Sequence, residues 1–257
     1  MWRQTRHRDL KEEHRPDRIR ERISAPGGES WLGDAVLGGV DGIVTTFAVV
    51  AGSAGGRLST EVVIVLGLAN LIADGFSMAV SNYLGTRSRR EEVEEAKEDE
   101  SWQIDSYPLG EHREVREIFA RKGFRGPTLD RIVDVITRDR EVWIDTMLEE
   151  ELNLQRVAAS PRRAALVTFI AFVLFGSIPL IPFVFPIQAQ QRLFLISGVL
   201  SAAAFAILGV WKGVMLHRPP VRSGLQTFLI GSIAAVLAYG VGAVLHSLFG
   251  VVPANAA

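Results

Sequence analysis

The sequence predicts an all-α polytopic membrane protein with five transmembrane helices and a cytoplasmic helical domain between the second and third helices. Five segments are apolar over the ~20 residues that a helix needs to cross a hydrocarbon core. The charged residues are concentrated in two blocks, residues 1–30 and 86–163, and the remainder of the chain is almost uncharged. Basic residues flank the apolar segments mainly on one side, as is typical of the cytoplasmic side of a membrane protein.

The apolar segments lie at about 32–55, 60–84, 164–186, 191–214 and 224–249. We expect helices because open strands cannot satisfy their backbone groups in lipid, and no window alternates as a transmembrane barrel strand would. The second segment is interrupted by Asn70, Asp74 and small residues, not by Lys or Arg. The third ends in Pro179, Pro182 and Pro186, which should break the regular helix near one membrane surface.

The basic residues predict the orientation, since cytoplasmic flanks carry the excess of Lys and Arg. They leave only Arg57 and Arg192 on the opposite side, so we expect a cytoplasmic N-terminus and a C-terminus outside. The predicted parts are a cytoplasmic charged tail (1–30), transmembrane helices 1–2 (31–85), a cytoplasmic domain (86–163), transmembrane helices 3–5 (164–250) and a short non-cytoplasmic tail (251–257). Neither a cleavable signal nor an organelle address is recognisable, so a bacterial cytoplasmic membrane is the expected location.

The composition excludes several kinds of site. There is no cysteine, which excludes disulfides, thiolate metal sites and cysteine nucleophiles. The five histidines form no pair at metal-ligand spacing, so a tight structural zinc site is not expected. No nucleophile–base pair, phosphate loop or cofactor motif is present, so we predict neither an enzyme nor a prosthetic group. The basic residues of the N-terminal tail are already accounted for by the orientation of the chain in the membrane, so no nucleic-acid partner is predicted.

Two carboxylates lie within predicted transmembrane helices, Asp41 in the first and Asp74 in the second. An ionised side chain at the bilayer centre costs at least ~2.5–3.5 kcal/mol, which favours a functional role. Each belongs to a row at helical spacing: Asp34, Gly38, Asp41 and Thr45 in the first helix, and Asn70, Asp74 and Met78 in the second. Because such rows lie on one helical stripe, they predict a path of oxygen and sulfur donors for a cation.

Two roles are open for these carboxylates. They could bind the cation and exchange protons as it passes, which would couple its movement to a proton gradient. They could instead be structural, each hydrogen-bonded to a neighbouring helix. Asp34 lies near the cytoplasmic end of the first helix, where an ion would enter. Small residues four apart, such as Gly38 and Gly42, allow close helix approach, either within the chain or between two copies.

Residues 86–163 form a block too long for a loop without structure of its own. The predicted elements are a continuation of the second transmembrane helix to about 103, a break at 107–110, and helices at 111–122, from 127 onward and at about 140–157. Helix formers, a glycine after the second helix and a proline at the start of the third support this division.

Three acidic sets lie in this block. They are the run from Glu91 to Glu100, the triplet Glu111, Glu114 and Glu117, and Glu151 with Met147 one turn before it. A charge run alone is usually a solvated helix face, but like charges at such spacing repel, and bound divalent cations would offset that repulsion. A thioether adds a preference for transition metals over Ca²⁺ or Mg²⁺. We therefore predict a helical metal-binding domain.

Two stretches of the sequence resemble the vacuolar iron transporter family: Asp41 to Gly52 (DGIVTTFAVVAG), and Leu66 to Ala79 (LGLANLIADGFSMA) followed by SNYL. The match is specific over the first two transmembrane helices, and helices three to five agree mainly in hydropathy and position. The resemblance implies a homodimer in membrane lipid that moves Fe²⁺, and often Mn²⁺ or related ions, out of the cytoplasm in exchange for protons.

The resemblance also implies metal ligands. The family's intramembrane aspartate and methionine fall on Asp41 and Met78, and its cytoplasmic glutamates and methionines fall on Glu100, Glu111, Glu114, Met147 and Glu151. The chain departs from the family pattern at several positions: Gln103 stands for an acid, Leu148 for a methionine, Asn70 for an acid that Asp74 follows one turn later, and Ser30 for an acid beside Glu29.

The sequence therefore predicts a proton-coupled exporter of divalent transition metal, with Fe²⁺ as the expected ion and Mn²⁺ as the alternative. Cytoplasmic glutamates would capture the ion, and Glu29 and Asp34 would guide it to the membrane. Asp41 and Met78 would bind it there, and Asp74 would bind metal or carry protons. The competing predictions are a manganese-selective exporter and a membrane-bound metal sensor that transports nothing.

Overall fold

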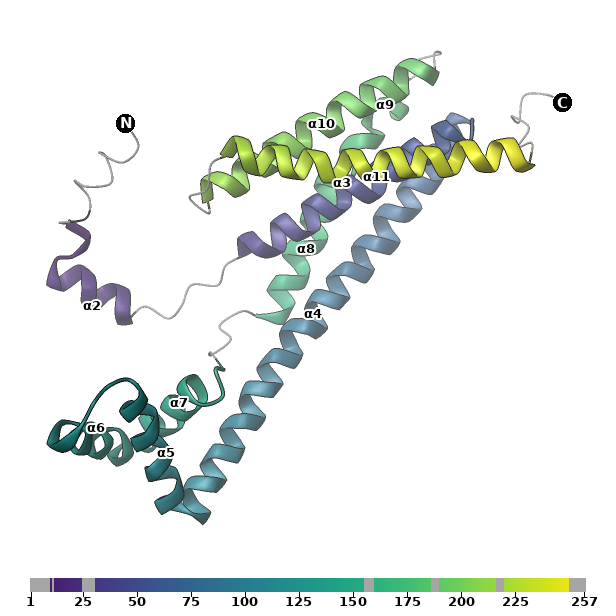
Figure 1. The fold of residues 1–257 in the computed structure, drawn as a ribbon. Coiled ribbons are helices and arrows are strands. Elements are labelled where there is room, and N and C mark those ends of the chain that lie inside the picture. The colour runs from purple at the N-terminus through teal and green to yellow at the C-terminus, as the bar shows by residue number, and fades with distance from the viewer. Residues whose placement is uncertain are drawn as a thin grey trace. The chain divides into compact units, whose positions relative to one another are not determined.

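The computed structural model describes residues 10, 12–24, 31–154, 160–185, 190–215 and 220–249. Every regular element within these ranges is a helix, which confirms the all-α prediction (Figure 1). The chain divides into two compact units. The acidic unit comprises residues 1–29 and 87–159, and the membrane unit comprises residues 30–86 and 160–257.

Five helices are long and apolar enough to cross a membrane, as the sequence predicted. Four of them have bounds within a few residues of those predicted, and the second continues as a charged helix past the predicted apolar segment, as expected. The helices that contain them are α3 (Trp31–Gly55), α4 (Thr60–Ser106), α8 with its extension (Pro161–Val184), α10 (Gln190–Met215) and α11 (Pro220–Phe249).

Helix α3 is the central helix of the membrane unit and contacts α8, α10 and α11. Its glycines lie where these neighbours come closest. A Cβ on Gly38 would lie 2.2 Å from the carbonyl oxygen of Thr168 in α8, and one on Gly42 would lie 2.4 Å from that of Phe172. A Cβ on Gly55 would lie 2.3 Å from a carbonyl oxygen of α11. These small residues therefore serve helix packing within the chain.

The third transmembrane segment breaks near its end, as its prolines predicted. Helix α8 (Pro161–Gly176) is followed by the 3₁₀ turn η1 (Ile178–Leu180) and the short helix α9 (Ile181–Val184). Ser197 of α10 donates its hydroxyl to the carbonyl oxygen of Pro179 at 2.7 Å. The neighbouring helix thus satisfies a backbone group near the break, as the absence of water in lipid requires. Pro186 lies outside the described residues.

Helix α4 is continuous over 47 residues, and its two parts belong to different units. The part up to Thr86 is apolar and belongs to the membrane unit, whereas the part from Arg87 to Ser106 is charged and belongs to the acidic unit. In the apolar part, Leu71 is buried, while Phe76 is 64% exposed. One face of this part is therefore apolar and exposed in the single chain, which suits contact with lipid or with a second copy.

The acidic unit is built from the end of α4 together with α5 (Pro108–Arg121), α6 (Gly126–Arg138) and α7 (Arg140–Glu150). Its core contains Ile104, Val115, Leu129, Val133, Trp143, Ile144, Met147 and Leu148. Arg140 donates to both carboxylate oxygens of Asp105, each at 2.6 Å. This bidentate pair joins the start of α7 to the end of α4.

Two predicted boundaries in this unit were wrong. Helix α7 ends at Glu150, short of the predicted end near Val157, because three consecutive glutamates (Glu149–Glu151) oppose the helix dipole at its C-terminus. Asn153 then takes a positive φ of 55°. The predicted break at 107–110 is only one residue long, since Pro108 begins α5 and proline is favoured in the first turn of a helix.

Candidate functional site

The predicted row on α3 lies in a regular helix, and its members have different surroundings. Asp34, Asp41 and Thr45 are partly exposed, whereas Gly38 is buried against α8. Thr45 donates its hydroxyl to the backbone oxygen of Asp41 at 2.9 Å. Three oxygen-bearing side chains of the row therefore remain accessible on α3, and the glycine among them is used for packing.

Asp34 is hydrogen-bonded to a second helix and, through it, to a third. Nδ2 of Asn82 in α4 donates to Oδ1 of Asp34 at 2.8 Å and to Oγ1 of Thr168 in α8 at 2.7 Å. The Thr168 side chain is fully buried, and its hydroxyl lies 3.5 Å from the backbone oxygen of Asp34. A polar network of three side chains thus connects α3, α4 and α8.

The rows on α3 and α4 meet at a second place. Nδ2 of Asn70 in α4 lies 3.5 Å from Oγ1 of Thr45 in α3, at the limit of a hydrogen bond. Asp74 follows Asn70 by one turn on α4, and Asp41 precedes Thr45 by one turn on α3. The structure therefore brings the donors of the two helices to the same part of the membrane unit.

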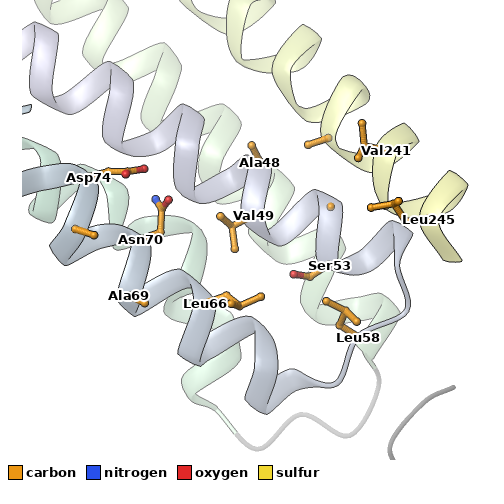
Figure 2. A pocket seen from close by; sticks show the side chains of 14 residues that line it. Ala48, Val49, Ser53, Leu58, Leu66, Ala69, Asn70, Asp74, Val241 and Leu245 are labelled. Atoms are coloured by element: carbon orange, nitrogen blue, oxygen red, sulfur yellow. The ribbon is translucent and has the colours of Figure 1, made fainter. Parts of the chain in front are cut away.

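A groove of about 700 Å³ lies beside these residues, between α3, α4 and α11 (Figure 2). Asn70 and Asp74 line it from α4, and Ser53 lines it from α3. The other lining side chains are Ala, Val, Leu and Gly. Asp74 is exposed in the single chain, so this groove presents a carboxylate within otherwise apolar walls.

Met78 follows Asp74 by one helical turn and is partly buried. It packs against an apolar cluster that includes Leu71 and Phe172. The structure therefore shows a packing contact for this side chain, and its role as a soft metal ligand stays a prediction. Glu29, predicted to guide ions to the membrane, lies outside the described residues.

Two carboxylates of the acidic unit are almost completely buried. Glu100 of α4 is 3% exposed and Glu111 of α5 is 4% exposed. The Oε2 atom of each has no hydrogen-bond partner among the described residues. An unsatisfied buried polar group costs ~1–3 kcal/mol, and more when it is charged. Each of these carboxylates is therefore unfavourable unless it holds a proton or a cation.

The neighbouring acids increase this cost. Burial, and then the charges of Glu111, Glu151, Glu114 and Asp99, raise the pKa of Glu100 to about 7. Burial and then the charges of Glu114 and Glu151 raise the pKa of Glu111. Burial, the charge of Glu114 and a hydrogen bond with it raise the pKa of Glu151. Acids from α4, α5 and the end of α7 thus form one electrostatic cluster.

The other predicted residues of this unit differ in their contacts. Met147 is fully buried in the apolar core. Glu117 lies 3.2 Å from Arg121 in an exposed ion pair. Within the described ranges, no three His, Asp or Glu side chains have the geometry of a formed metal site.

Comparison with known proteins identifies the family. The model of the VIT family matches residues 32–243, which include both donor rows and the helices α5, α6 and α7. The chain belongs to the VIT family. It is 36% identical over 224 residues to the vacuolar iron transporter of Toxoplasma gondii, covering 84% of this chain and 74% of that protein. It is 33% identical over 217 residues to vacuolar iron transporter 1 of Eucalyptus grandis, covering 83% and 86%, respectively.

A third relative, vacuolar iron transporter 1 of Arabidopsis thaliana, is 32% identical over 209 residues, covering 80% of this chain and 82% of that protein. Family membership and the five apolar helices together make this VIT-family chain an integral membrane protein. The match covers residues 87–159 of the acidic unit as well as the apolar helices.

Two polar residues of this VIT-family member were not predicted as site residues. Asn82 continues the row of Asn70, Asp74 and Met78 at the same spacing of four, so extending that pattern by one turn would have found it. Thr168 gives no such signal, because its position in the network depends on how closely α8 approaches Gly38.

Proposed function

We propose that this chain is a proton-coupled transporter that exports divalent transition metal from the cytoplasm, with Fe²⁺ as its expected substrate. The observation that carries the proposal is the meeting of two donor rows within the membrane unit, where Asn70 of α4 lies 3.5 Å from Thr45 of α3, each one turn from an aspartate of its own helix. The names of the curated relatives, vacuolar iron transporters, support iron as the ion.

The two intramembrane carboxylates suit exchange between a metal ion and protons. One divalent cation offsets the charge of two carboxylates, and so do two protons. Neither carboxylate is stable as an isolated charge in the membrane. Departure of the metal would therefore favour protonation of the carboxylates, and binding of the metal would favour release of their protons. In this proposal Asp41 and Met78 bind the metal, and Asp74 binds metal or carries protons. Asn70 and Thr45 supply neutral oxygen atoms beside them.

The acidic unit is proposed to capture the ion in the cytoplasm. Its support is the unsatisfied burial of Glu100 and Glu111 together with the charges of Glu114 and Glu151. A divalent cation would partner the unpaired oxygens and offset the repulsion in one step. Met147 lies in the core of the same unit, and in this proposal it would be the soft donor to such an ion. These ligands would favour a transition metal over Ca²⁺.

The proposal places the acidic unit and the N-terminus in the cytoplasm and the C-terminus on the opposite side. The basic flanks of the transmembrane helices support this orientation. The relatives' names refer to the vacuole, and a bacterial cytoplasmic membrane is the location predicted from the sequence. Export from the cytoplasm has the same direction relative to the acidic unit in both membranes.

A homodimer is part of the proposal. The groove beside Asp74 is bordered by α4 and α11, and both helices expose apolar side chains such as Phe76 and Val236. An exposed carboxylate facing acyl chains would be unfavourable, whereas a second copy could enclose it. The family resemblance supports the same arrangement.

Vesicle flux tests the function directly. The purified full-length chain is reconstituted, and Fe²⁺ uptake is followed with the lumen more acidic than the outside, with the gradient collapsed, and with protein-free vesicles. We expect protein-dependent uptake that the gradient accelerates, together with proton release from the lumen. An equal rate of Fe²⁺ uptake with and without the pH gradient would remove proton coupling from the proposal.

Competition separates the remaining candidates. Excess Mn²⁺ in the same vesicles distinguishes an iron exporter from a manganese-selective one, because the preferred ion suppresses uptake of the other at lower concentration. Binding of Fe²⁺ to the protein without any uptake would identify a metal sensor. The buried, unpaired acids of the acidic unit are compatible with that alternative.

A further inference from the structure

The side-chain amide of Asn82 is the hydrogen-bond donor that holds the Asp34 carboxylate. Its Nδ2 hydrogens are directed to two acceptors, Oδ1 of Asp34 at 2.8 Å and Oγ1 of Thr168 at 2.7 Å. A carboxylate only accepts hydrogen bonds, so the nitrogen, not the oxygen, of the Asn82 amide must face it. Both amide hydrogens are therefore committed, and the amide has a single favourable orientation.

The Thr168 hydroxyl is itself held in place. The side chain is fully buried, and the backbone of Thr168 is in close contact with Gly38, where a Cβ would lie 2.2 Å from its carbonyl oxygen. The hydroxyl hydrogen points to the backbone oxygen of Asp34 at 3.5 Å. Asp34 is thus contacted through both its side chain and its backbone by one small network, which fixes where its carboxylate lies.

This arrangement leaves Asp34 with one oxygen engaged and one available. Oδ1 accepts from Asn82, and among the described residues the hydrogen bonds of the Asp34 carboxylate involve no other side chain. A carboxylate held by one N–H donor is already oriented. Binding of an ion to its second oxygen therefore costs little further rotational freedom of the side chain.

We propose that Asn82, oriented by Thr168, is a positioning residue that presents the free oxygen of Asp34 to the incoming metal ion. This inference rests on the proposed function and concerns the residue at which the ion enters the membrane unit. Asn82 does not touch the ion in this proposal. It acts through Asp34 and determines how well the metal is captured, not how fast the bound ion crosses.

The test measures initial Fe²⁺ uptake against Fe²⁺ concentration in vesicles that contain the full-length chain. In Asn82→Ala, the half-saturating concentration (KM) should rise about tenfold, as expected for a lost hydrogen bond to a charged group, while the maximal rate changes less than about twofold. Thr168→Val, which keeps the shape but removes the hydroxyl, should raise KM about threefold. Thr168→Ser keeps the hydroxyl and should behave as the unaltered chain.

A matched control removes a buried hydroxyl outside this network. Ser201 of α10 donates only within its own helix, to the backbone oxygen of Ser197 at 2.7 Å, so Ser201→Ala should leave KM unchanged. A merely structural role for Asn82 would lower the maximal rate or the yield of folded protein instead of raising KM. Thr168→Val keeps the test decisive if Asn82→Ala does not fold, because an unchanged KM in that variant overturns the proposal.

A double-mutant comparison separates this inference from the proposed function. Asp34→Ala alone should raise KM about tenfold or more, and adding Asn82→Ala to it should have no further effect, because Asn82 acts through Asp34. Additive effects of the two substitutions on KM would overturn this inference but not the proposed function. The same holds if Asp34→Ala raises KM and Asn82→Ala leaves it unchanged. No uptake by the unaltered chain would overturn the proposed function, and the inference with it.

Discussion

In the membrane unit, Asp34 accepts a hydrogen bond from Asn82, whereas in the acidic unit Glu100 and Glu111 are buried with one oxygen each unpaired. The membrane carboxylates are also few and lie along two helices, with amide and hydroxyl groups between them. The acids of the other unit act on one another from three helices. The same residue type is therefore used in two ways.

The difference has a physical consequence for ion binding. A crowded set of unpaired acids gains much from a divalent cation and should release it slowly, which suits capture. Separated carboxylates with neutral partners gain less at each position, which suits passage from one to the next. Loss of the intramembrane carboxylate Asp41 should therefore affect mainly the rate of transport, whereas changes among the crowded acids of the acidic unit should affect mainly the affinity for metal.

The largest effect is expected from Asp41→Ala. Loss of the carboxylate removes the charge that the intramembrane ion requires, so uptake into vesicles should fall by about 100-fold or more, equivalent to about 2.7 kcal/mol. Metal binding by the acidic unit, measured by calorimetry on the same full-length protein, should be unchanged. Full transport by this variant would remove Asp41 from the mechanism.

The next effect is expected from Glu111→Gln, which keeps the shape of a buried acid but removes its charge. Metal affinity of the acidic unit should fall about tenfold, because one charged ligand is lost, while the maximal rate of transport is retained. Glu117→Gln is the matched control on the same helix. Its partner is the exposed Arg121, so metal affinity should be unaltered, and a loss equal to that of Glu111→Gln would show that Glu117 belongs to the cluster.

Gly38→Ala should destabilise the membrane unit by about 1–3 kcal/mol, because the added methyl meets the backbone of α8 and neither helix can yield easily. Gly33 lies in the same helix, and a Cβ there has nothing within 4 Å. Gly33→Ala is therefore expected to be neutral or slightly stabilising. Thermal unfolding of both variants in detergent measures the difference, and equal melting temperatures would contradict the observed packing.

The smallest effect is a pH dependence of the metal-free acidic unit. The pKa of Glu100 is raised from 4.5 to about 7 in the folded chain, so folding favours its protonated form. The resulting stability is fully present below about pH 4.5 and is lost as the pH rises through about 7. Between pH 5 and pH 8, protection of α5 and α7 against hydrogen exchange, corrected for intrinsic rates, should therefore fall.

Glu100→Gln provides the control for this dependence. Without an ionisable group at this position, the loss of protection between pH 5 and pH 8 should become smaller, and the metal-free variant should be the more stable protein at pH 8. Added Mn²⁺, used as the metal probe, should stabilise the unaltered chain more than the variant. An unchanged pH dependence would show that Glu100 is not the titrating group.

The five apolar helices and the break after α8 could be predicted because they depend on local properties, namely hydropathy and the restricted backbone of proline. The end of α7 could not, since helix formers continue past Glu150 in the sequence and only the accumulated negative charge and the turn at Asn153 end the helix. Hydropathy also gives no information about which helix packs on which. The central place of α3 therefore appeared only in the structure.

The candidate site divides in the same way. The sequence by itself determined which carboxylates lie in apolar helices and on which stripe, because helical spacing fixes the side of a helix that a residue occupies. Only the tertiary structure decided that Asn82 and Thr168 meet at Asp34 and that Glu100 and Glu111 are both buried and act on each other. These contacts join residues from different helices, and their distances depend on how closely glycines and small side chains allow those helices to approach.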